Sequence, residues 1–408
     1  MRRFIDRVLR LIYERGFFAL VREALDRGIN VIIRKIVRAI TDVDNNKIIF
    51  LGFSGNYDCN PKYICQELMK KNADVKIVWV IYDNTDTSPG LFPDNIKFTV
   101  RDTYDCYKQL CSAKVIVDNG VSTAWLKYKK KKSQCLIETW HGSIGIKKFG
   151  RGSNKDPYWL SVAEKEGKMT DYIISNSNFE DDVYRDNFWK NTPIWKFGHA
   201  RNDVFYLADD KKKEIKDKVY SWYDLDPDVH ICLYGPTFRD DGDMSPYVID
   251  YDKLTETLKK RFGGDWVVLT RFHFKTKKFF ANGNARLPQN VIDATNYPDI
   301  YELLSCTDVG ITDYSSWICE YMLSRKPGFT FATDIDSYAT TNRSFFIPLS
   351  DYPFPFANNE NDLFSNIASF DSDKYVADCN AFLVANGSVD DGHASEKVVA
   401  EIMKLLGK

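Results

Sequence analysis

The sequence predicts two doubly wound α/β domains that follow one another along the chain. The length of 408 residues is natural for two domains of roughly 100–200 residues each. Short Ile/Val-rich runs alternate with polar helical stretches, which fits parallel sheets covered by helices on both faces. The alternation occurs in two consecutive series. Ligands bind such sheets at the carboxyl ends of the strands, so we expect the site in the cleft between the domains.

Residues 1–45 precede the first series and differ from the rest in charge. Residues 1–40 contain ten Lys and Arg against four Asp and Glu, and these charges interrupt every apolar stretch that could span a membrane. Phe4, Val8, Leu11 and Ile12 recur at helical spacing. The pattern predicts basic amphipathic helices that dock on an anionic membrane surface. The alternatives are a surface helix packed on the protein's own core and an oligomer contact.

The first domain is expected over residues 46–225. Its predicted buried strands are 48–53, 75–82, 114–119, 134–140 and 172–177. Helices are expected between them, for example at 63–71 and 103–113. The run KYKKKK at 127–132 is the sharpest charge feature, and it is either a solvated loop or a patch that faces phosphate or a membrane.

The second domain is expected over residues 226–408. Its predicted strands are 230–236, 265–272, 291–295, 308–314 and 328–333. The helices expected between them include 251–261, 300–305 and 316–323, and a last helix runs from about 394 to 406. The second domain therefore repeats the alternation of the first.

Composition excludes several function classes. Lys+Arg is 56 and Asp+Glu is 57, a net charge of -1, which argues against a general nucleic-acid binder. The nine cysteines include no C-x-x-C pair, so they indicate reduced thiols of a cytosolic protein rather than a disulfide framework or zinc site. The sequence has no Walker A, GxGxxG, HExxH or GxSxG motif. It therefore indicates no P-loop kinase, dinucleotide oxidoreductase, zincin or α/β-hydrolase.

Two histidines that follow predicted strands are candidates for chemistry. His141 ends a strand and precedes Gly142 and Gly145, so backbone can approach a ligand closely beside a side chain suited to general base catalysis. The alternative is a histidine packed in a turn. His273 follows the strand 265–272, and an extended backbone would place it on one face with Arg271 and Lys275, where all three could meet one anion.

Two further strand ends in the second domain carry polar side chains. The segment TDYSS at 312–316 runs from a strand into a helix, so Ser315 and Ser316 could hold phosphates with free N–H groups, or one of them could simply cap the helix. Glu320 lies one turn further and could reach a ribose hydroxyl. The segment LYGPTFRDDG at 233–242 adds Thr237 and Arg239.

Seven short blocks resemble the CDP-glycerol glycerophosphotransferase family, whose members build teichoic acids and related polyol phosphate polymers. TWHG at 139–142 with KKFG at 147–150 is similar to that family's TWHGTPLKxLG, and TDYSS matches its TDYSS. The other blocks follow in family order: FGHARND at 197–203, YGPTFRD at 234–240, RFH at 271–273, KP at 326–327 and DGHAS at 391–395. Ser143-Ile144-Gly145, His199-Ala200 and Phe274 depart from the family pattern. These departures indicate a divergent subfamily.

The resemblance implies a GT-B-like fold, with two Rossmann-like domains that face a cleft. The first domain would bind the acceptor and the second the CDP-polyol donor, and the chemistry would need no cofactor or metal. A polyol phosphate, glycerol phosphate above all, would pass from CDP-glycerol or CDP-ribitol to a hydroxyl of a polyprenyl-diphosphate-linked glycan, releasing CMP. The protein would act as a peripheral protein at the cytoplasmic face of the membrane. The alternatives are a GT-B glycosyltransferase that uses a nucleotide sugar and a non-catalytic member of the fold.

The resemblance also assigns roles residue by residue. His141 would be the general base on the acceptor hydroxyl, and His273 would bind the pyrophosphate and assist the departure of CMP. The substrate-binding residues it implies are Gly142, Thr237, Arg239, Arg271, Thr312, Ser315, Ser316 and Glu320. Primase and polymerase activities both stay open.

Overall fold

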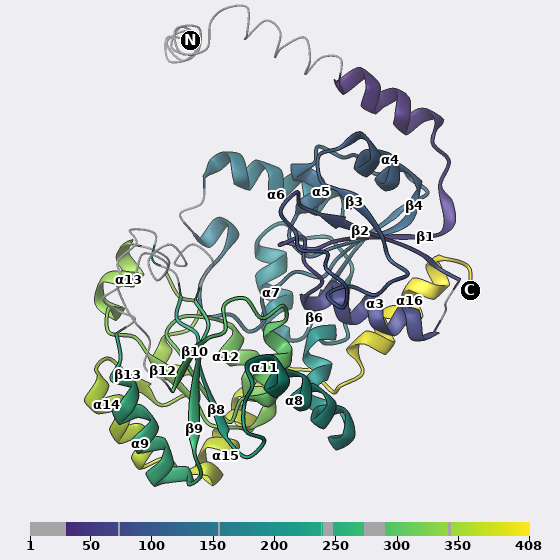
Figure 1. Cartoon of the computed structure of the whole chain (residues 1–408). Helices are drawn as coiled ribbons and strands as arrows, with labels where there is room; N and C mark the ends of the chain where they lie inside the picture. The colour runs from purple at the N-terminus through teal and green to yellow at the C-terminus, as the bar shows by residue number, and fades with distance from the viewer. Residues whose placement is uncertain are drawn as a thin grey trace, which may run out of the picture.

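The chain forms two lobes, and each is built around one parallel sheet with helices on its faces (Figure 1). The structure is a computed structural model that describes residues 30–71, 74–153, 156–237, 239, 248–272, 290–341 and 344–408. Within these residues the two sheets have the strand orders β3-β2-β1-β4-β5-β6-β7 and β10-β9-β8-β11-β12-β13. Both are doubly wound, which confirms the predicted fold class.

The first sheet has its topological switch point between β1 and β4. Its strands are β1 (Asp44–Leu51), β2 (Lys76–Ile81), β3 (Lys97–Val100), β4 (Ala113–Asp118), β5 (Cys135–Glu138), β6 (Tyr172–Ser175) and β7 (Ile194–Lys196). The helices that connect them are α3 (Cys59–Lys71), α4 (Tyr104–Ser112), α5 (Ser122–Trp125), α6 (Pro157–Met169) and α7 (Asn178–Asp186), and η1 (Gly150–Gly152) and η2 (Ala200–Tyr206) are 3₁₀ turns.

Alternation along β1 builds the core on both faces of this sheet. Ile48 and Phe50 belong to one buried cluster, and Ile49 and Leu51 belong to another on the opposite face together with Leu110 of α4. Successive side chains of a strand point to opposite faces, so a strand buried on both sides is apolar throughout. The β1 sequence IIFL has this character.

The second sheet repeats this arrangement. Its strands are β8 (His230–Tyr234), β9 (Trp266–Thr270), β10 (Val291–Asp293), β11 (Val309–Thr312), β12 (Gly328–Phe331) and β13 (Phe356–Ala357). Its helical segments are α8 (Asp209–Tyr223), α9 (Tyr251–Phe262), α11 (Ile300–Cys306), α12 (Trp317–Tyr321), η5 (Met322–Ser324), α13 (Ile335–Thr341), η6 (Leu349–Asp351), α14 (Glu360–Ala368) and α15 (Ser372–Ala385). The switch point lies between β8 and β11.

The last helix, α16 (Ala394–Leu405), crosses back to the first lobe and lies beside α3 (Figure 1). Its Val398 and Ile402 are fully buried in the same cluster as Ile48 and Phe50. Asp203 receives the first two free backbone N–H groups of this helix, from Ala394 at 3.0 Å and Ser395 at 2.8 Å. The expected second domain of 226–408 thus differs from the structure at its carboxyl end, because the apolar face of α16 belongs to the first sheet.

At the other end, residues 30–40 form a helix that protrudes from the first lobe (Figure 1). The amphipathic helices are predicted within residues 1–45, and residues 1–29 of that segment lie outside the described residues. Within the described chain, none of the helices combines the length and apolar character needed to cross a bilayer.

Candidate active site

A cleft of about 660 Å³ opens at the carboxyl ends of the strands of the first sheet. Phe53 follows β1, Gly120 follows β4 and His141 follows β5, and all three line it. Ser316 and Phe346 of the second domain form part of the opposite wall. The cleft therefore lies where the switch-point rule places a ligand in a doubly wound sheet.

The backbone turns sharply just before His141. Trp140 has a φ of 50°, a left-handed conformation that is uncommon for a residue with a side chain. Glu138 accepts a hydrogen bond from the Trp140 N–H at 2.8 Å, and the Asn60 amide donates to the carbonyls of Thr139 and Trp140 at 3.1 and 3.2 Å. These buried partners hold the turn that directs the next side chain into the cleft.

His141 is held in one tautomer. Its Nδ1 lies 2.5 Å from the carbonyl oxygen of Asn119, which can only accept, so Nδ1 carries the proton and Nε2 keeps its lone pair. The ring stacks between Phe53 and Trp140, with centroids at 5.0 and 4.5 Å. Burial lowers the pKa of His141 to about 4, although the bond to Asn119 opposes this shift. The ring is therefore a neutral proton acceptor at neutral pH.

Three buried carboxylates lie beneath the loops that line the cleft. Ligand atoms of Asp118, Glu138 and Glu166 lie within 4.8 Å of one another, close enough for a metal site. Backbone N–H groups already bind their oxygens, for example Thr123 N on Asp118 at 2.9 Å and Trp140 N on Glu138. We therefore assign this cluster a structural role: it anchors the loop that follows β4 and the loop that follows β5.

The same cluster retains protons at neutral pH. Burial and the charge of Asp118 raise the pKa of Glu166 to about 8. Burial, Asp118 and Glu166 together raise the pKa of Glu138 well above its usual range. Carboxylates packed this closely cannot all ionise, since each charge disfavours the next.

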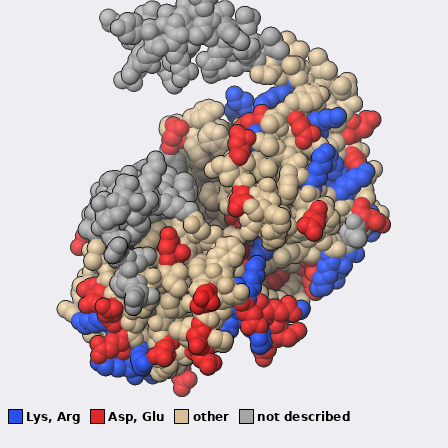
Figure 2. Space-filling view, viewed as in Figure 1, with Lys and Arg blue, Asp and Glu red and all other residues tan. Residues whose placement is uncertain are grey.

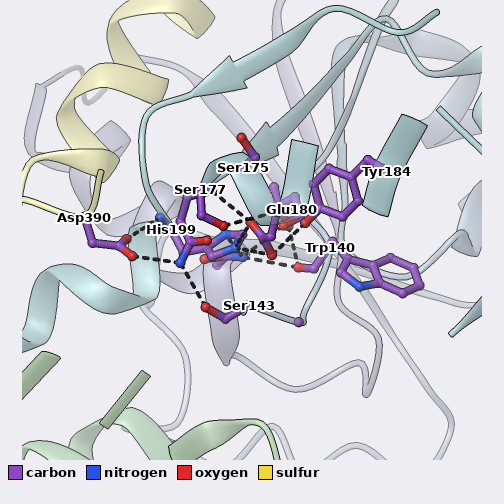
Figure 3. A network of polar contacts seen from close by, with 12 residues as sticks. Trp140, Ser143, Ser175, Ser177, Glu180, Tyr184, His199 and Asp390 are labelled. Atoms are coloured by element: carbon purple, nitrogen blue, oxygen red, sulfur yellow. Dashed lines mark hydrogen bonds and ion pairs between the residues drawn. The ribbon is translucent and has the colours of Figure 1, made fainter. Parts of the chain in front are cut away.

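A second polar network lies behind the cleft, centred on Glu180 (Figure 3). Glu180 is buried, lines the cleft and accepts hydrogen bonds from Tyr184 Oη at 2.9 Å and from Asn176 N at 2.8 Å. His199 Nε2 lies 2.9 Å from the same carboxylate, and His199 is fully buried. Asp390 receives the His199 backbone N–H at 2.9 Å, and burial raises the pKa of Asp390 to about 6.

This network contains functional candidates that the sequence analysis did not assign. Ser177-Asn178-Phe179-Glu180 has the S-x-x-E pattern of a helix start, and Ser177 Oγ indeed accepts from Glu180 N at 3.2 Å. That pattern could have indicated Glu180. The contact between FGHARND and the segment near Asp390 joins residues about 190 positions apart, so no local signal reports it.

Buried ion pairs join the two domains beside the cleft. Arg201 of the first domain pairs with Glu320 of the second, and both side chains are almost completely buried. The same guanidinium donates to the Gly142 carbonyl at 2.6 Å. Further along the interface, the buried Lys62 binds Asp299 at 2.5 Å and Glu302 at 2.7 Å. The loop that carries His141 is thereby tied to α12 of the second domain.

The YGPTFRD and TDYSS segments interlock at the second switch point. Asp313 Oδ1 accepts the Thr237 backbone N–H at 2.8 Å, and Asp313 Oδ2 pairs with Arg239 at 2.8 Å. Arg239 is buried and also binds Asp334 at 2.7 Å. Thr312 is buried and donates to the Gly235 carbonyl at 2.6 Å. These contacts place Arg239 and Thr312 inside the domain, where they hold the loops together.

The structure brings part of the predicted site together. His141, Gly142 and Ser316 line the cleft, and Thr237 is joined to it by a 3.4 Å hydrogen bond from Lys147, which also lines it. Ser316 makes no side-chain cap with α12, so its hydroxyl is not used by the helix.

The other predicted residues that the structure describes are not among those that line this cleft. Ser315 is half-buried beside Ser316, and Arg271 is half-buried and donates to the carbonyls of Ala294 and Tyr297, each at 2.9 Å. Both carboxylate oxygens of Glu320 are occupied, by Arg201 and by Tyr301 Oη. His273 lies outside the described residues.

Two doubly wound domains that share one cleft define a GT-B-like α/β protein. A solved structure described as a UDP-N-acetylglucosamine 2-epimerase from Listeria monocytogenes shares this fold at a TM-score of 0.51, with 12% identity over 88% of this chain and 96% of that one. Residues 33–404 match the family CDP-glycerol:poly(glycerophosphate) glycerophosphotransferase, and the chain belongs to that family.

Individual relatives agree with this assignment. The teichoic acid poly(glycerol phosphate) polymerase of Staphylococcus epidermidis is 29% identical over 377 residues, covering 88% of this chain and 51% of that protein. The teichoic acid glycerol-phosphate transferase of Staphylococcus aureus is 24% identical, covering 88% of this chain and 94% of that protein. This chain spans about half the length of the polymerases from S. epidermidis and Bacillus subtilis.

Solved structures of the wall teichoic acid polymerase TagF match almost the whole chain. One has a TM-score of 0.78 and 28% identity, covering 95% of this chain and 98% of that one. Another, a His-to-Asn variant soaked with CDPG, has a TM-score of 0.79 and 26% identity over the same shares. The family predicted from the short blocks of the sequence is confirmed.

Proposed function

We propose that this protein transfers a polyol phosphate from a CDP-polyol to an acceptor hydroxyl and releases CMP, with His141 as the general base. The observation that carries the proposal is the bond from His141 Nδ1 to the Asn119 carbonyl, which leaves Nε2 as a proton acceptor in the cleft. Membership of the family supports a CDP-polyol as the donor.

The reaction exchanges one bond to phosphorus for another. The acceptor oxygen forms a bond to the phosphorus next to the polyol, the bond from that phosphorus to CMP breaks, and the acceptor proton passes to Nε2 of His141. A positioned base contributes about 10²–10⁴-fold to such a step. Negative charge grows on CMP as it leaves, and Lys147 and the Ser316 hydroxyl are the groups of the described cleft wall that we expect to face it.

The test measures nucleotide release from CDP-glycerol, CDP-ribitol and UDP-sugars with a lipid-linked disaccharide acceptor. We expect CMP from one of the CDP-polyols, and His141→Ala should lower kcat by about 10²–10⁴-fold while donor affinity stays unchanged. His393→Ala is the matched control, because His393 is exposed at the start of α16. Release of UDP alone would favour a glycosyltransferase. Full activity of the His141→Ala variant would exclude His141 as the general base.

We further propose that the helix over residues 30–40 docks the protein on an anionic membrane at its cytoplasmic face. Val37 is buried, and Arg34 and Arg38 donate to the carbonyls of Leu126 and Lys129 at 3.0 and 2.9 Å. Five large apolar side chains of this helix are exposed, Val31, Ile32, Ile33, Ile36 and Ile40, and the polar Asn30 and basic Lys35 are exposed as well. An apolar face beside clustered lysines suits an anionic bilayer surface.

The lysine-rich run KYKKKK lies beside this helix, because Arg38 also donates to the Lys130 carbonyl and Lys131 donates to the Thr41 carbonyl. Figure 2 shows that the described surface at the top of the molecule is mostly uncharged, with both basic and acidic side chains below it. Two segments far apart in the sequence thereby contribute to one surface.

Co-sedimentation with phosphatidylglycerol-containing vesicles tests the docking surface. The double variant Ile32→Glu with Ile36→Glu should lose binding, because two charges enter the apolar face. Val384→Glu is the control, since Val384 is 81% exposed on α15 in the second domain. Equal vesicle binding by the double variant and the control would refute the proposal.

A further inference from the structure

The cleft extends well beyond His141, along the first sheet and away from the second domain. Tyr82 follows β2 and Arg101 follows β3, and both line the same cleft as Phe53 and His141. Because the strand order is β3-β2-β1, Arg101, Tyr82 and Phe53 succeed one another along the carboxyl edge of the sheet. The cleft thus has a wing that belongs to the first domain alone.

Direct contacts join these side chains into a row that ends at His141. Arg101 Nη1 donates to Tyr82 Oη at 3.1 Å, and its guanidinium lies 5.2 Å from the centre of the Tyr82 ring. Tyr82 Oη donates to the Phe53 carbonyl at 3.2 Å, and Phe53 stacks on His141. A rigid, partly aromatic wall therefore runs from a cation to the proposed base.

In this wing of the cleft, Phe53 can make apolar contacts with a ligand and Arg101 can bind a negatively charged group. Phe53 is 56% exposed, so a large apolar ring faces the cleft next to the reacting group. Arg101 pairs with Asp102, but the separation is 3.7 Å and the Asp102 side chain is 68% exposed. Only 16% of the Arg101 side chain is exposed, but its ion pair is long and Asp102 faces solvent, so the pair contributes little energy and an anion in the cleft can replace Asp102.

The cations of the cleft lie on both sides of His141. Among the residues that line the described cleft, Lys147 and Arg101 carry positive charge. Lys147 contacts Thr237 and bridges to Phe345, both in the second domain. Arg101 belongs to the far edge of the first sheet. A donor diphosphate held near the second domain would therefore use Lys147 and not Arg101.

We propose that Arg101, Tyr82 and Phe53 form an acceptor subsite, in which Arg101 binds a phosphate of the acceptor and Phe53 packs against the apolar face of the acceptor unit beside the attacking hydroxyl. This inference rests on the proposed function and names the chemistry of the second substrate. The bound group is a phosphate ester on the acceptor, either the phosphodiester of a polyol phosphate chain or the diphosphate of a lipid anchor. Arg is suited to this task because its planar guanidinium can bind two phosphate oxygens at once.

Steady-state kinetics separate the two substrates. Arg101→Gln should raise the KM of the acceptor about 10- to 100-fold, as expected for the loss of a charge-assisted contact, and leave the KM of the donor unchanged. Arg101→Lys should recover part of the loss, because the charge returns without the planar fork. Arg151→Gln is the control, because Arg151 is exposed outside the cleft and pairs with Glu164 at 2.9 Å.

Two acceptors identify the source of the phosphate. One is a lipid-diphosphate disaccharide, and the other is the same molecule extended by one glycerol phosphate. If Arg101→Gln raises the acceptor KM for the extended acceptor alone, Arg101 binds the phosphodiester of the chain. If Arg101→Gln raises the acceptor KM for both acceptors, Arg101 binds the diphosphate of the anchor. An unchanged acceptor KM for both, or an equal rise in donor KM, would overturn the proposal.

A binding measurement separates failure of this inference from failure of the proposed function. Tryptophan fluorescence titration of the whole protein, without donor, uses a water-soluble disaccharide diphosphate that carries glycerol phosphate and so offers both kinds of phosphate. Weaker binding to Arg101→Gln than to Arg151→Gln would support the subsite even if no nucleotide were released. Equal binding would overturn the subsite even in an active enzyme.

Discussion

Replacing Glu320 by glutamine should destabilise the protein strongly, although the side chain keeps its size. The Glu320 carboxylate accepts from Arg201 on one oxygen and from Tyr301 Oη at 2.6 Å on the other. Arg201 has no exposed side-chain surface and Glu320 has 3%. The glutamine would leave the guanidinium buried without its counter-charge and would direct an N–H group at one of two donors.

Breaking a buried pair in this way destabilises a protein by about 3–5 kcal/mol. That is a large fraction of a total stability of about 5–15 kcal/mol. Each kcal/mol lost from the free energy of unfolding lowers the Tm of a domain of this size by about 2–4 °C, so we expect the Tm of the Glu320→Gln variant to fall by roughly 6–20 °C. Differential scanning calorimetry measures this fall directly.

The matched control is Asp378→Asn, which removes an exposed pair with Lys374 on α15. An exposed pair contributes only about 0–1 kcal/mol, so that variant should melt close to the wild type. If the two variants melt alike, the buried pair does not stabilise the interface as argued. A normal Tm combined with a raised donor KM would instead favour the contact between Glu320 and a ribose hydroxyl.

Three further predictions concern buried charges. Glu166→Gln should gain stability relative to the wild type as pH rises from about 4.5 to about 8, because the unfolded carboxyl ionises above its ordinary pKa of 4.5 while the native carboxyl keeps its proton up to a pKa of about 8; thermal melts from pH 4 to 9 measure this. The kcat/KM of the wild type should fall as pH decreases through about 4, since protonation of His141 removes the base, and a pH–rate profile checks this. Lys62→Met should lower stability by about 3–5 kcal/mol in urea unfolding, because it leaves Asp299 and Glu302 buried without their lysine.

The central strands of both sheets could be predicted from the sequence, and three strands at or near sheet edges could not. β1, β4 and β8 each contain a continuous apolar run, because both of their faces are buried there. β3, β7 and β13 are only two to four residues long and are partly exposed. Edge strands of this kind carry too few apolar residues to stand out from loops.

The position of His141 and Ser316 in the cleft wall could be predicted, because each residue follows the end of a parallel strand. Asn60, Asn119 and Glu180 act through buried hydrogen bonds to residues distant in the sequence, and no spacing reports such contacts. Glu320 and Arg239 were predicted to bind ligand, but their charges are taken up by Arg201 and by Asp313. Sequence pattern indicates that a charge lies near the cleft, and only the fold shows which partner it meets.

The return of α16 to the first lobe means that the polypeptide passes between the lobes twice, once between η2 and α8 and once between α15 and α16. Two covalent crossings define one axis, drawn through both of them, about which a rotation of the lobes would stretch neither connection. Any opening of the cleft to admit substrate should therefore be a rotation about this single hinge axis and not a rotation in arbitrary directions. Cutting the chain between Ala385 and Ala394 would remove one of the two crossings and leave the other intact.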